Sequence, residues 1–309
     1  MIDRRSLFVA SATLMAVTAL PKAQAGAPEE VIDLWPGMPP GGGGPKGPVR
    51  VTPKGAVDHI SRPYMRVYRP KNPNGAAMLV AAGGGLKHIG LRQESTPAAL
   101  WLAAHGITAF ELIYRLPGEG WADGRRVPLQ DAQRAVRLIR AQAGQYGLTS
   151  TRLGVLGFSA GGYVMGLTAD WFDFQTYSPV DSADSLSARP DNAALIYPVI
   201  TLEPPYQHTV TRRQMVGDDP TPPLSAEWSV QTHVRANGPS MFLVQAKDDP
   251  ISNPANTLIM EKACEQAGVP VVLHQLPRGG HGFGMGVQGT PTAKWPLWYA
   301  NWLTQQGMI

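Results

Sequence analysis

The serine in the segment Gly157-Phe-Ser159-Ala-Gly161 is the residue best placed to act as a nucleophile. The G-x-S-x-G spacing leaves small residues two positions to either side of the serine, as a tight turn between a strand and a helix requires. An apolar run over 152–158 precedes the serine, and a helical pattern over 160–169 follows it. A serine that merely caps a helix needs no such neighbours. The sequence therefore predicts that Ser159 attacks a carbonyl carbon.

A serine hydroxyl reacts only when a base takes its proton, and an acid must hold that base in place. At such strand-to-helix turns the acid and then the histidine follow the serine along the chain, each in a loop after a later strand. His281, between Gly280 and Gly282, follows the last strand-like run, and Asp248 and Asp249 follow the run before it. The order predicts His281 as the base and one of the two aspartates as the acid.

Attack on an ester creates an oxyanion, which backbone N–H groups stabilise. Ala160, directly after the nucleophile, is one expected donor, and a loop after an earlier strand supplies another. The apolar run 76–82 ends in Gly83-Gly84-Gly85, whose backbone can face a substrate without intervening side chains. A phosphate cradle is disfavoured, because no Gly-Lys-Ser/Thr follows these glycines. His88, just beyond them, is given a substrate contact at most.

The elements that must position these residues alternate along the chain. Strand-like apolar runs cover 64–68, 76–82, 107–113, 152–158, 193–197, 241–246 and 269–276. Helical patterns cover 97–105, 129–143, 160–169, 254–267 and 291–305. Strands that alternate with helices predict an α/β fold with a mostly parallel sheet and helices on both faces.

The arginines of one predicted helix and two irregular segments lie outside the apolar patterns. Arg134, Arg137 and Arg140 lie off the apolar stripe of the helix over 129–143, which predicts a solvated face. The segments 170–191 and 203–237 interrupt the alternation and are rich in Pro, Ser, Asp and aromatic residues. Both are predicted to emerge at the carboxyl edge of the sheet and to wall a substrate cleft.

Composition narrows the function classes. With 309 residues, 43% of them hydrophobic and 16% charged, the chain predicts one globular domain over 26–309. Its net charge of +4 is small, and its aromatic residues are not interleaved with Lys/Arg runs, which disfavours a nucleic-acid partner. No HExxH sequence, paired cysteines or Asp/Asn-rich loop indicates a metal, so neither a metal nor a cofactor is expected. The sole cysteine, Cys264, is predicted to be a buried, inert thiol.

The first 25 residues have the pattern of a secretory signal peptide. A charged head with Arg4 and Arg5 precedes a short apolar stretch over 7–20, and Ala23-Gln-Ala25 forms an A-x-A cleavage site. The apolar stretch is too short for a stable membrane anchor. Periplasmic or secreted localisation is therefore expected. The start resembles a twin-arginine signal, but Asp3 stands where Ser or Thr is usual, so the Sec route stays open.

Taken together, these motifs resemble those of α/β-hydrolase esterases related to acetyl xylan esterases, often labelled xylanase-associated or BD-FAE-like. The resemblance is carried by AGGGL (82–86), ITAFELIYRL (107–116), VPLQDAQRAVRLIR (127–140), LGVLGFSAGG (153–162), SARPDNAALIYPVI (187–200), FLVQAKDDP (242–250) and GVPVVLHQLPRGGHGFG (268–284). These segments occur in order between about Tyr64 and Leu303.

The resemblance implies an α/β-hydrolase fold without a separate lid domain. Carried onto the matching positions, it implies Ser159 as nucleophile, Asp249 before Pro250 as acid, His281 as base, and Gly84, Gly85 and Ala160 as oxyanion donors. Asp248 is then expected to brace its loop or face solvent.

The activity implied is that of a secreted serine esterase that removes acetyl groups from xylan-type saccharides through an acyl-enzyme. Its partner would be a small-molecule or oligosaccharide ester. Relatives commonly carry an aromatic residue where this chain has Leu86, and Glu-Gly where it has Glu94-Ser95, so substrate preference is expected to depart from theirs near Leu86. Trp121, Trp228 and Phe283 are candidate surfaces for sugar rings.

Other functions fit the sequence less well. A feruloyl esterase or another carboxylesterase would use the same residues on a different acyl group. A peptidase of the prolyl-oligopeptidase type usually carries a propeller domain that this chain lacks. An inactive carbohydrate-binding protein would not need an intact Ser159, Asp249 and His281.

Overall fold

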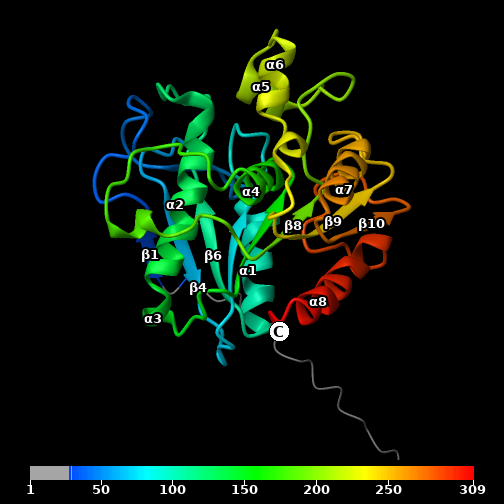
Figure 1. Cartoon of the computed structure of the whole chain (residues 1–309), viewed down its shortest axis with the longest axis horizontal. Coiled ribbons are helices and arrows are strands. Elements are labelled where there is room, and N and C mark those ends of the chain that lie inside the picture. Colours follow the sequence, from blue (N-terminus) through cyan, green and yellow to red (C-terminus); the bar gives the residue numbers. More distant parts are fainter. Residues whose placement is uncertain (1–27, 29) are drawn as a thin grey trace, which may run out of the picture.

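The computed structural model describes Pro28 and residues 30–309, so the predicted signal peptide (1–25) lies outside the described residues. An eight-stranded sheet in the order β1-β4-β6-β5-β7-β8-β9-β10 forms its centre (Figure 1). The strands are β1 (Glu30–Asp33), β4 (Tyr64–Tyr68), β5 (Ala77–Ala81), β6 (Thr108–Ile113), β7 (Leu153–Phe158), β8 (Asn192–Ile196), β9 (Ser240–Ala246) and β10 (Val271–Leu276). A separate hairpin joins β2 (Arg50–Val51) to β3 (Val57–Asp58). The strands β1, β4 and β6 pair antiparallel, and every other pairing in the large sheet is parallel.

Helices cover both faces of this sheet. They are α1 (Ser95–Ala104), α2 (Val127–Ala141), α3 (Ala143–Tyr146), α4 (Ala160–Asp170), α5 (Val210–Val216), α6 (Pro222–Glu227), α7 (Ala255–Ala267) and α8 (Trp295–Gln305). Short 3₁₀ turns lie at Leu91–Gln93, Gly124–Arg126, Ser182–Ser185, Val230–His233 and Pro291–Lys294. Buried residues of α2, α4 and α7 share one core cluster, and those of α1 and α8 share the other.

The central strands explain why both core clusters form. Side chains of a strand alternate between the two faces of a sheet. In β5, Leu79 and Ala81 join the cluster under α2 and α4, whereas Met78 and Val80 join the cluster under α1 and α8. Such a strand must be apolar at every position, which is why it reads as a continuous apolar run. The predicted mostly parallel sheet with helices on both faces is confirmed.

The arginines of α2 do not form the predicted solvated face. Arg134 is only 1% exposed: its Nε donates to the Leu34 carbonyl at 2.8 Å, and its guanidinium pairs with Asp184 at 3.0 Å. Arg137 donates to the Tyr177 hydroxyl at 2.7 Å, and Arg140 to the Ser187 carbonyl at 2.7 Å. The prediction was wrong because the segment 170–191 runs along α2 and supplies acceptors to these side chains.

The same contacts correct the expected place of the segment 170–191. It follows α4, which leads away from the carboxyl edge of the sheet, and it returns the chain to the start of β8. None of its residues lines the cavity at Ser159. The insertion between β8 and β9 does leave the carboxyl edge, and α5 and α6 protrude there at the top of Figure 1.

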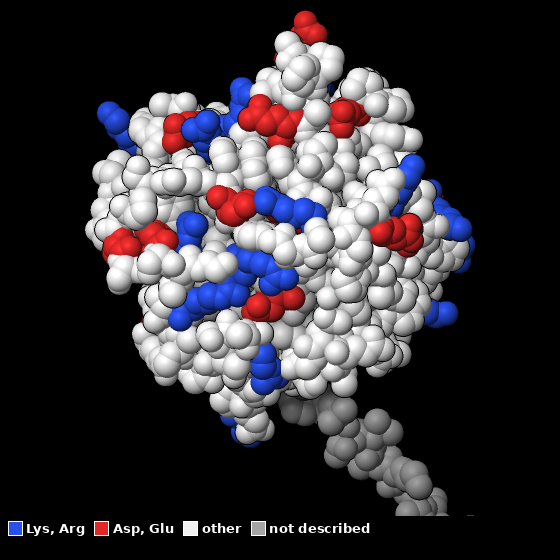
Figure 2. Space-filling model, viewed as in Figure 1, with Lys and Arg blue, Asp and Glu red and all other residues white. Residues whose placement is uncertain are grey.

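Surface charge and helix length are two properties of the molecule that bear on its possible partners. Basic and acidic side chains are interspersed over the face shown in Figure 2. Among the described residues, no helix has both the length and the apolar composition needed to cross a bilayer.

Candidate active site

Ser159 lies at a strained turn between β7 and α4. Its φ of 51° and ψ of −118° are unusual for a residue with a side chain, and its N–H donates to the Ile196 carbonyl at 2.9 Å. The neighbouring glycines make this turn possible. A Cβ on Gly157 would approach the Gly161 carbonyl oxygen to 2.4 Å, and one on Gly161 would approach the Ala81 carbonyl oxygen to 2.3 Å. The G-x-S-x-G spacing is thus required by close backbone packing.

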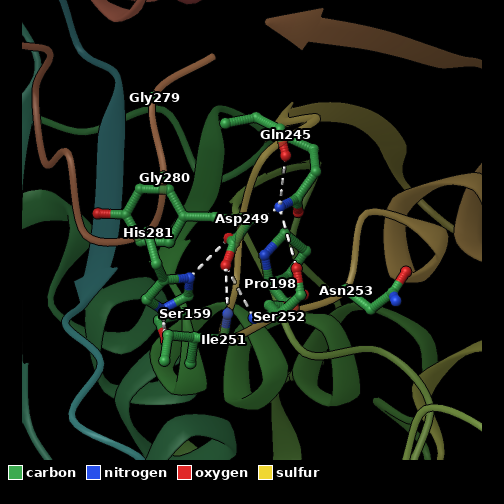
Figure 3. A network of polar contacts seen from close by, with 12 residues as sticks. Ser159, Pro198, Gln245, Asp249, Ile251, Ser252, Asn253, Gly279, Gly280 and His281 are labelled. Carbon is green, nitrogen blue, oxygen red and sulfur yellow. Dashed lines mark hydrogen bonds and ion pairs between the residues drawn. The ribbon is translucent and has the colours of Figure 1, made fainter. Parts of the chain in front are cut away.

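Ser159, His281 and Asp249 form a continuous hydrogen-bonded chain (Figure 3). Ser159 Oγ lies 2.7 Å from His281 Nε2, and His281 Nδ1 lies 2.7 Å from Asp249 Oδ2. The serine is 8% exposed and the aspartate 6%. Because a carboxylate can only accept, the proton of the neutral imidazole belongs on Nδ1, which leaves Nε2 free to accept the serine proton.

The two aspartates after β9 have different partners. Asp249 accepts at Oδ1 from the N–H groups of Ile251 and Ser252, at 2.8 and 2.9 Å, and at Oδ2 from Gln245 as well as from His281. Asp248 is exposed and accepts from the N–H groups of the histidine loop at Gly279 and Gly280, each at 2.8 Å. These N–H groups hold the pKa of the Asp248 carboxyl below its ordinary value. Asp248 therefore braces the loop that carries His281 and does not touch the imidazole.

The glycine loop after β5 comes close to the serine. A Cβ on Gly83 would lie 2.7 Å from Ser159 Cβ and 3.2 Å from Ala160 N. Gly84, with a φ of 128°, has no room for a side chain, because a Cβ there would lie 2.2 Å from the His88 carbonyl oxygen. Among the described residues, the N–H groups of Gly84, Gly85 and Ala160 donate to no protein acceptor. Three backbone donors are thus available beside the serine, although two of them are in a loop 75 residues away.

A cavity of about 360 Å³ opens at Ser159 and His281. The glycine loop, including Lys87 and His88, forms one wall, and the end of the 3₁₀ turn before α1, at Gln93 and Glu94, continues it. Thr209, Val210 and Thr211 from the start of α5, with Val199 and Ile251, close the other side. The prediction that the segment 203–237 walls a cleft is confirmed for these three residues.

A second hollow of about 280 Å³ adjoins the cavity and shares Thr209 and Ile251 with it. Its other walls are Pro205, Tyr206, His208, Asp249, Pro250 and Asn253. Ile251, between the two hollows, is 57% exposed. The combination of one aromatic ring, apolar Ile and Pro side chains, and polar groups gives this hollow both apolar and hydrogen-bonding surface.

The four residues predicted to contact substrate do not line either hollow, which corrects that expectation. Leu86 is fully buried, because its φ of 59° turns it into the core beneath the glycine loop. Trp121 is 5% exposed under the Arg115 guanidinium, at 4.8 Å, and Trp228 is 2% exposed against Trp171. Phe283 is 6% exposed and packs on Tyr197, with 4.4 Å between ring centroids. All four are packing residues.

Two buried polar residues next to the cavity were given no role from the sequence, although Glu94 belongs to the Glu94-Ser95 pair that departs from relatives. Glu94 accepts from the Gly83 N–H at 2.6 Å and from the Tyr197 hydroxyl at 3.0 Å. Burial raises the pKa of the Glu94 carboxyl, while the two hydrogen bonds act in the opposite direction. Burial also raises the pKa of the Tyr197 phenol. The glutamate before a helix gave a local signal, but its partners lie 11 residues before it and 103 residues after it.

Two groups of side chains bear on metal binding and thiol chemistry in the described part of the chain. Among the described residues, no group of three or more His, Cys, Asp or Glu side chains is arranged to hold a metal ion. Cys264 is buried on α7, and burial raises the pKa of its thiol to about 12, so it stays protonated and unreactive at neutral pH.

Comparison with known sequences gives consistent matches. The family model described as BD-FAE matches residues 65–263. Endo-1,4-beta-xylanase B of Butyrivibrio fibrisolvens is 34% identical over 205 residues, which are 66% of this chain and 32% of the xylanase. Acetylxylan esterase of Xylanibacter ruminicola is 30% identical over 226 residues, 72% of this chain and 44% of the esterase. The matched region thus spans less than half the length of either relative.

Solved structures match over nearly the whole chain. An acetyl ester-xyloside bifunctional hydrolase from Caldicellulosiruptor lactoaceticus superposes with a TM-score of 0.77 at 30% identity, covering 91% of this chain and 97% of the hydrolase. Esterase 2 of Thermogutta terrifontis superposes with a TM-score of 0.67 at 21% identity, over 89% of this chain and 97% of that protein. The second likeness concerns the fold alone.

Proposed function

The chain belongs to the BD-FAE family, within the α/β-hydrolase esterases, and we propose that it is a serine esterase that hydrolyses O-acetyl groups on xylan-type saccharides. The observation that carries the reaction type is the hydrogen-bonded chain from Ser159 through His281 to Asp249, beside three backbone N–H groups that have no acceptor among the described residues. Support for the substrate comes from the acetylxylan esterase and the acetyl ester-xyloside hydrolase to which the chain is similar.

The geometry supports a two-step acyl transfer. Ser159 Oγ attacks the ester carbonyl carbon while its proton passes to His281 Nε2, and Asp249 stabilises the imidazolium that forms. The carbonyl oxygen becomes an oxyanion that accepts from Gly84, Gly85 and Ala160. His281 then gives its proton to the departing sugar oxygen, which leaves an acetyl group on Ser159. A water molecule, deprotonated by His281, attacks this acetyl-enzyme, and release of acetate restores the serine.

The hollows around the serine favour a saccharide as the alcohol part of the ester. Acetate is much smaller than the cavity of about 360 Å³, so most of that space is available to the alcohol. The adjoining hollow offers the Tyr206 ring together with the polar side chains of His208 and Asn253. A pyranose presents an apolar face and a rim of hydroxyl groups, which match these two kinds of surface.

A panel of substrates tests this function. Residues 26–309 would be assayed against acetylated xylo-oligosaccharides, a feruloylated arabinose, 4-nitrophenyl acetate and a proline peptide. We expect the highest kcat/KM for acetylated xylo-oligosaccharides, and loss of all ester hydrolysis, on the order of a millionfold in kcat, in Ser159→Ala. Turnover of aryl acetate alone would remove the support for a sugar ester, a preference for the feruloyl ester would reassign the acyl group, and near-normal turnover by Ser159→Ala would exclude that serine.

A further inference from the structure

The buried carboxyl of Glu94 holds the start of the glycine loop after β5. This loop, Gly83-Gly84-Gly85, is called the oxyanion loop below, because it carries the two glycine N–H donors. Glu94 precedes α1, is 7% exposed, and lines the cavity. Its Oε2 accepts from the Gly83 N–H at 2.6 Å, one residue before the glycine donors. The Gly83 carbonyl in turn accepts from Gly90 N–H at 2.8 Å, which closes the loop between them. The direction of the free N–H groups at Gly84 and Gly85 thus depends on where Glu94 holds Gly83.

Tyr197 connects the same carboxyl to the loop that carries His281. It directly follows β8 with a φ of 41°, and its N–H donates to the Val244 carbonyl at 2.7 Å. Its hydroxyl donates to Glu94 Oε1 at 3.0 Å and accepts from Gly284 N–H at 3.0 Å. Its ring lies edge-on to His281, with 4.9 Å between the ring centroids. One side chain therefore contacts both the base and the residue that supports the oxyanion loop.

We propose that Glu94 and Tyr197 are positioning residues that fix the oxyanion loop and the histidine loop relative to each other. The N–H donors and the base can then act on the same ester group. This inference rests on the proposed serine-esterase mechanism. It adds to the triad a second hydrogen-bonded chain, which runs from Gly83 through Glu94 and Tyr197 to Gly284.

Hydrogen-bond chemistry fixes the direction of this chain. The backbone N–H groups at both ends can only donate, so the Tyr197 proton must point to Glu94, and Glu94 must accept at both oxygens. Only the carboxylate form does so without losing a partner. Burial raises the pKa of Glu94, so acidification protonates it at a higher pH than an exposed glutamate. The chain should therefore weaken as the pH falls, in addition to any effect of protonating the base.

Glu94→Gln and Tyr197→Phe break this chain with little change of shape. A glutamine can still accept from Gly83 N–H, but its amide N–H group then faces a tyrosine whose own proton has no acceptor. Phenylalanine keeps the ring against His281 and removes the hydroxyl between Glu94 and Gly284. Tyr299→Phe is the matched control, because Tyr299 of α8 is fully buried and, among the described residues, its hydroxyl hydrogen-bonds only to Met78 Sδ, at 3.7 Å.

The test uses the single phosphorylation of Ser159 by diethyl 4-nitrophenyl phosphate, which releases one 4-nitrophenolate per chain and needs no knowledge of the natural ester. Loss of one oxyanion donor costs about 10²–10³ in rate, so misplacement of the loop should slow phosphorylation by roughly tenfold or more. We expect this loss in Glu94→Gln and in Tyr197→Phe, with Tyr299→Phe unchanged. The double variant should lose little more than either single variant, because the two residues act as one unit. The phosphorylation rate should decline less steeply with falling pH in Glu94→Gln than in the wild type.

The outcomes separate this inference from the choice of substrate. Wild-type rates in both single variants, losses that multiply in the double variant, or an equally steep decline with falling pH in Glu94→Gln and the wild type would overturn the positioning role. A chain that is phosphorylated but hydrolyses no acetylated sugar would contradict the proposed substrate, and the variants would still decide the role of Glu94 and Tyr197. A wild-type chain that is not phosphorylated would overturn the triad and the positioning role together.

Discussion

The neighbouring carboxylates at Asp248 and Asp249 show how a single position decides a residue's role. The pair follows β9, but only Asp249 is buried and turned to the imidazole. Its neighbour faces outward and holds the backbone of the histidine loop at Gly279 and Gly280. One aspartate thus orients the ring of His281, and the other orients the loop that carries it.

Replacing each aspartate by asparagine separates these roles. Asp249→Asn should lower kcat by about 10⁴, because the amide favours the wrong imidazole tautomer while the fold is kept. Asp248→Asn should lower kcat by less than about tenfold, because an amide oxygen still accepts from both loop N–H groups. Initial rates with 4-nitrophenyl acetate, alongside far-UV circular dichroism, measure both effects. A greater loss in Asp248→Asn than in Asp249→Asn would show that the acid has been assigned to the wrong residue.

At the scale of elements, the site depends on which strands are neighbours. β5 and β7 pair in parallel with Ala81 opposite Gly157, so the glycine loop and Ser159 leave the same sheet edge side by side. β8 and β9 follow on the other side of β7 and bring Tyr197 and Asp249 to that edge. The insertion between β8 and β9 then supplies the outer wall with Thr209, Val210 and Thr211.

This insertion offers a test of how substrate is held. Tyr206→Ala removes the phenol ring from the second hollow, and an aromatic contact is worth about 0.5–1.5 kcal/mol. The kcat/KM for acetylated xylotriose should therefore fall by about threefold to tenfold, while that for 4-nitrophenyl acetate, which has no sugar ring to stack on Tyr206, should not change. Tyr206→Phe, which keeps the ring, is the control. Equal losses on both substrates would mean that Tyr206 shapes the catalytic cavity itself.

At the scale of the whole molecule, one buried group stands apart from the packed core. Asp170, the last residue of α4, is fully buried, and neither carboxyl oxygen has a hydrogen-bond partner among the described residues. Burial raises its pKa well above the ordinary value. An ionised carboxylate in this place would be costly, so the folded state retains a proton that the unfolded chain releases above about pH 4.

The protein should therefore lose stability as the pH rises above about 4. The folded state binds one proton more than the unfolded state in this range, so the free energy of unfolding falls by up to about 1.4 kcal/mol per pH unit until the pH passes the folded pKa. Asp170→Asn should flatten this dependence and raise the melting temperature at pH 7. Asp173→Asn is the control, since Asp173 is half-exposed and paired with Arg235. Urea unfolding from pH 5 to pH 8 would contradict the prediction if the wild type and Asp170→Asn had the same slope.

Export is a further prediction for the whole chain. Expression of residues 1–309 in a Gram-negative host should give a periplasmic protein that begins at Gly26, as mass spectrometry of the intact protein would reveal. Arg4→Lys combined with Arg5→Lys should block export by the twin-arginine route and leave Sec export largely intact. A full-length chain in the cytoplasm of the wild-type strain would exclude the signal peptide.

The sequence by itself determined the parts whose cause is local. The continuous apolar runs revealed the parallel strands, because such strands are covered on both faces. The small residues around Ser159 predicted the tight turn between β7 and α4, because the backbone at Ala81 and Gly161 leaves no space for side chains. The order of Ser159, Asp249 and His281 followed from the strand after which each residue comes, and the family resemblance, now confirmed, chose between the two aspartates.

Only the tertiary structure decided what depends on partners that are distant in the chain. The arginines of α2 look solvated in sequence, yet the segment 170–191 folds over them. Leu86 and the tryptophans at 121 and 228 have the side chains of a sugar site, but packing buries them, because their neighbours come from other strands and loops. Glu94 and Tyr197 are 103 residues apart in the chain. No local sequence pattern predicts that the sheet edge brings this carboxyl, this phenol and the two loops together. Burial and pairing of this kind are properties of the assembled fold, since they depend on which groups exclude water from one another.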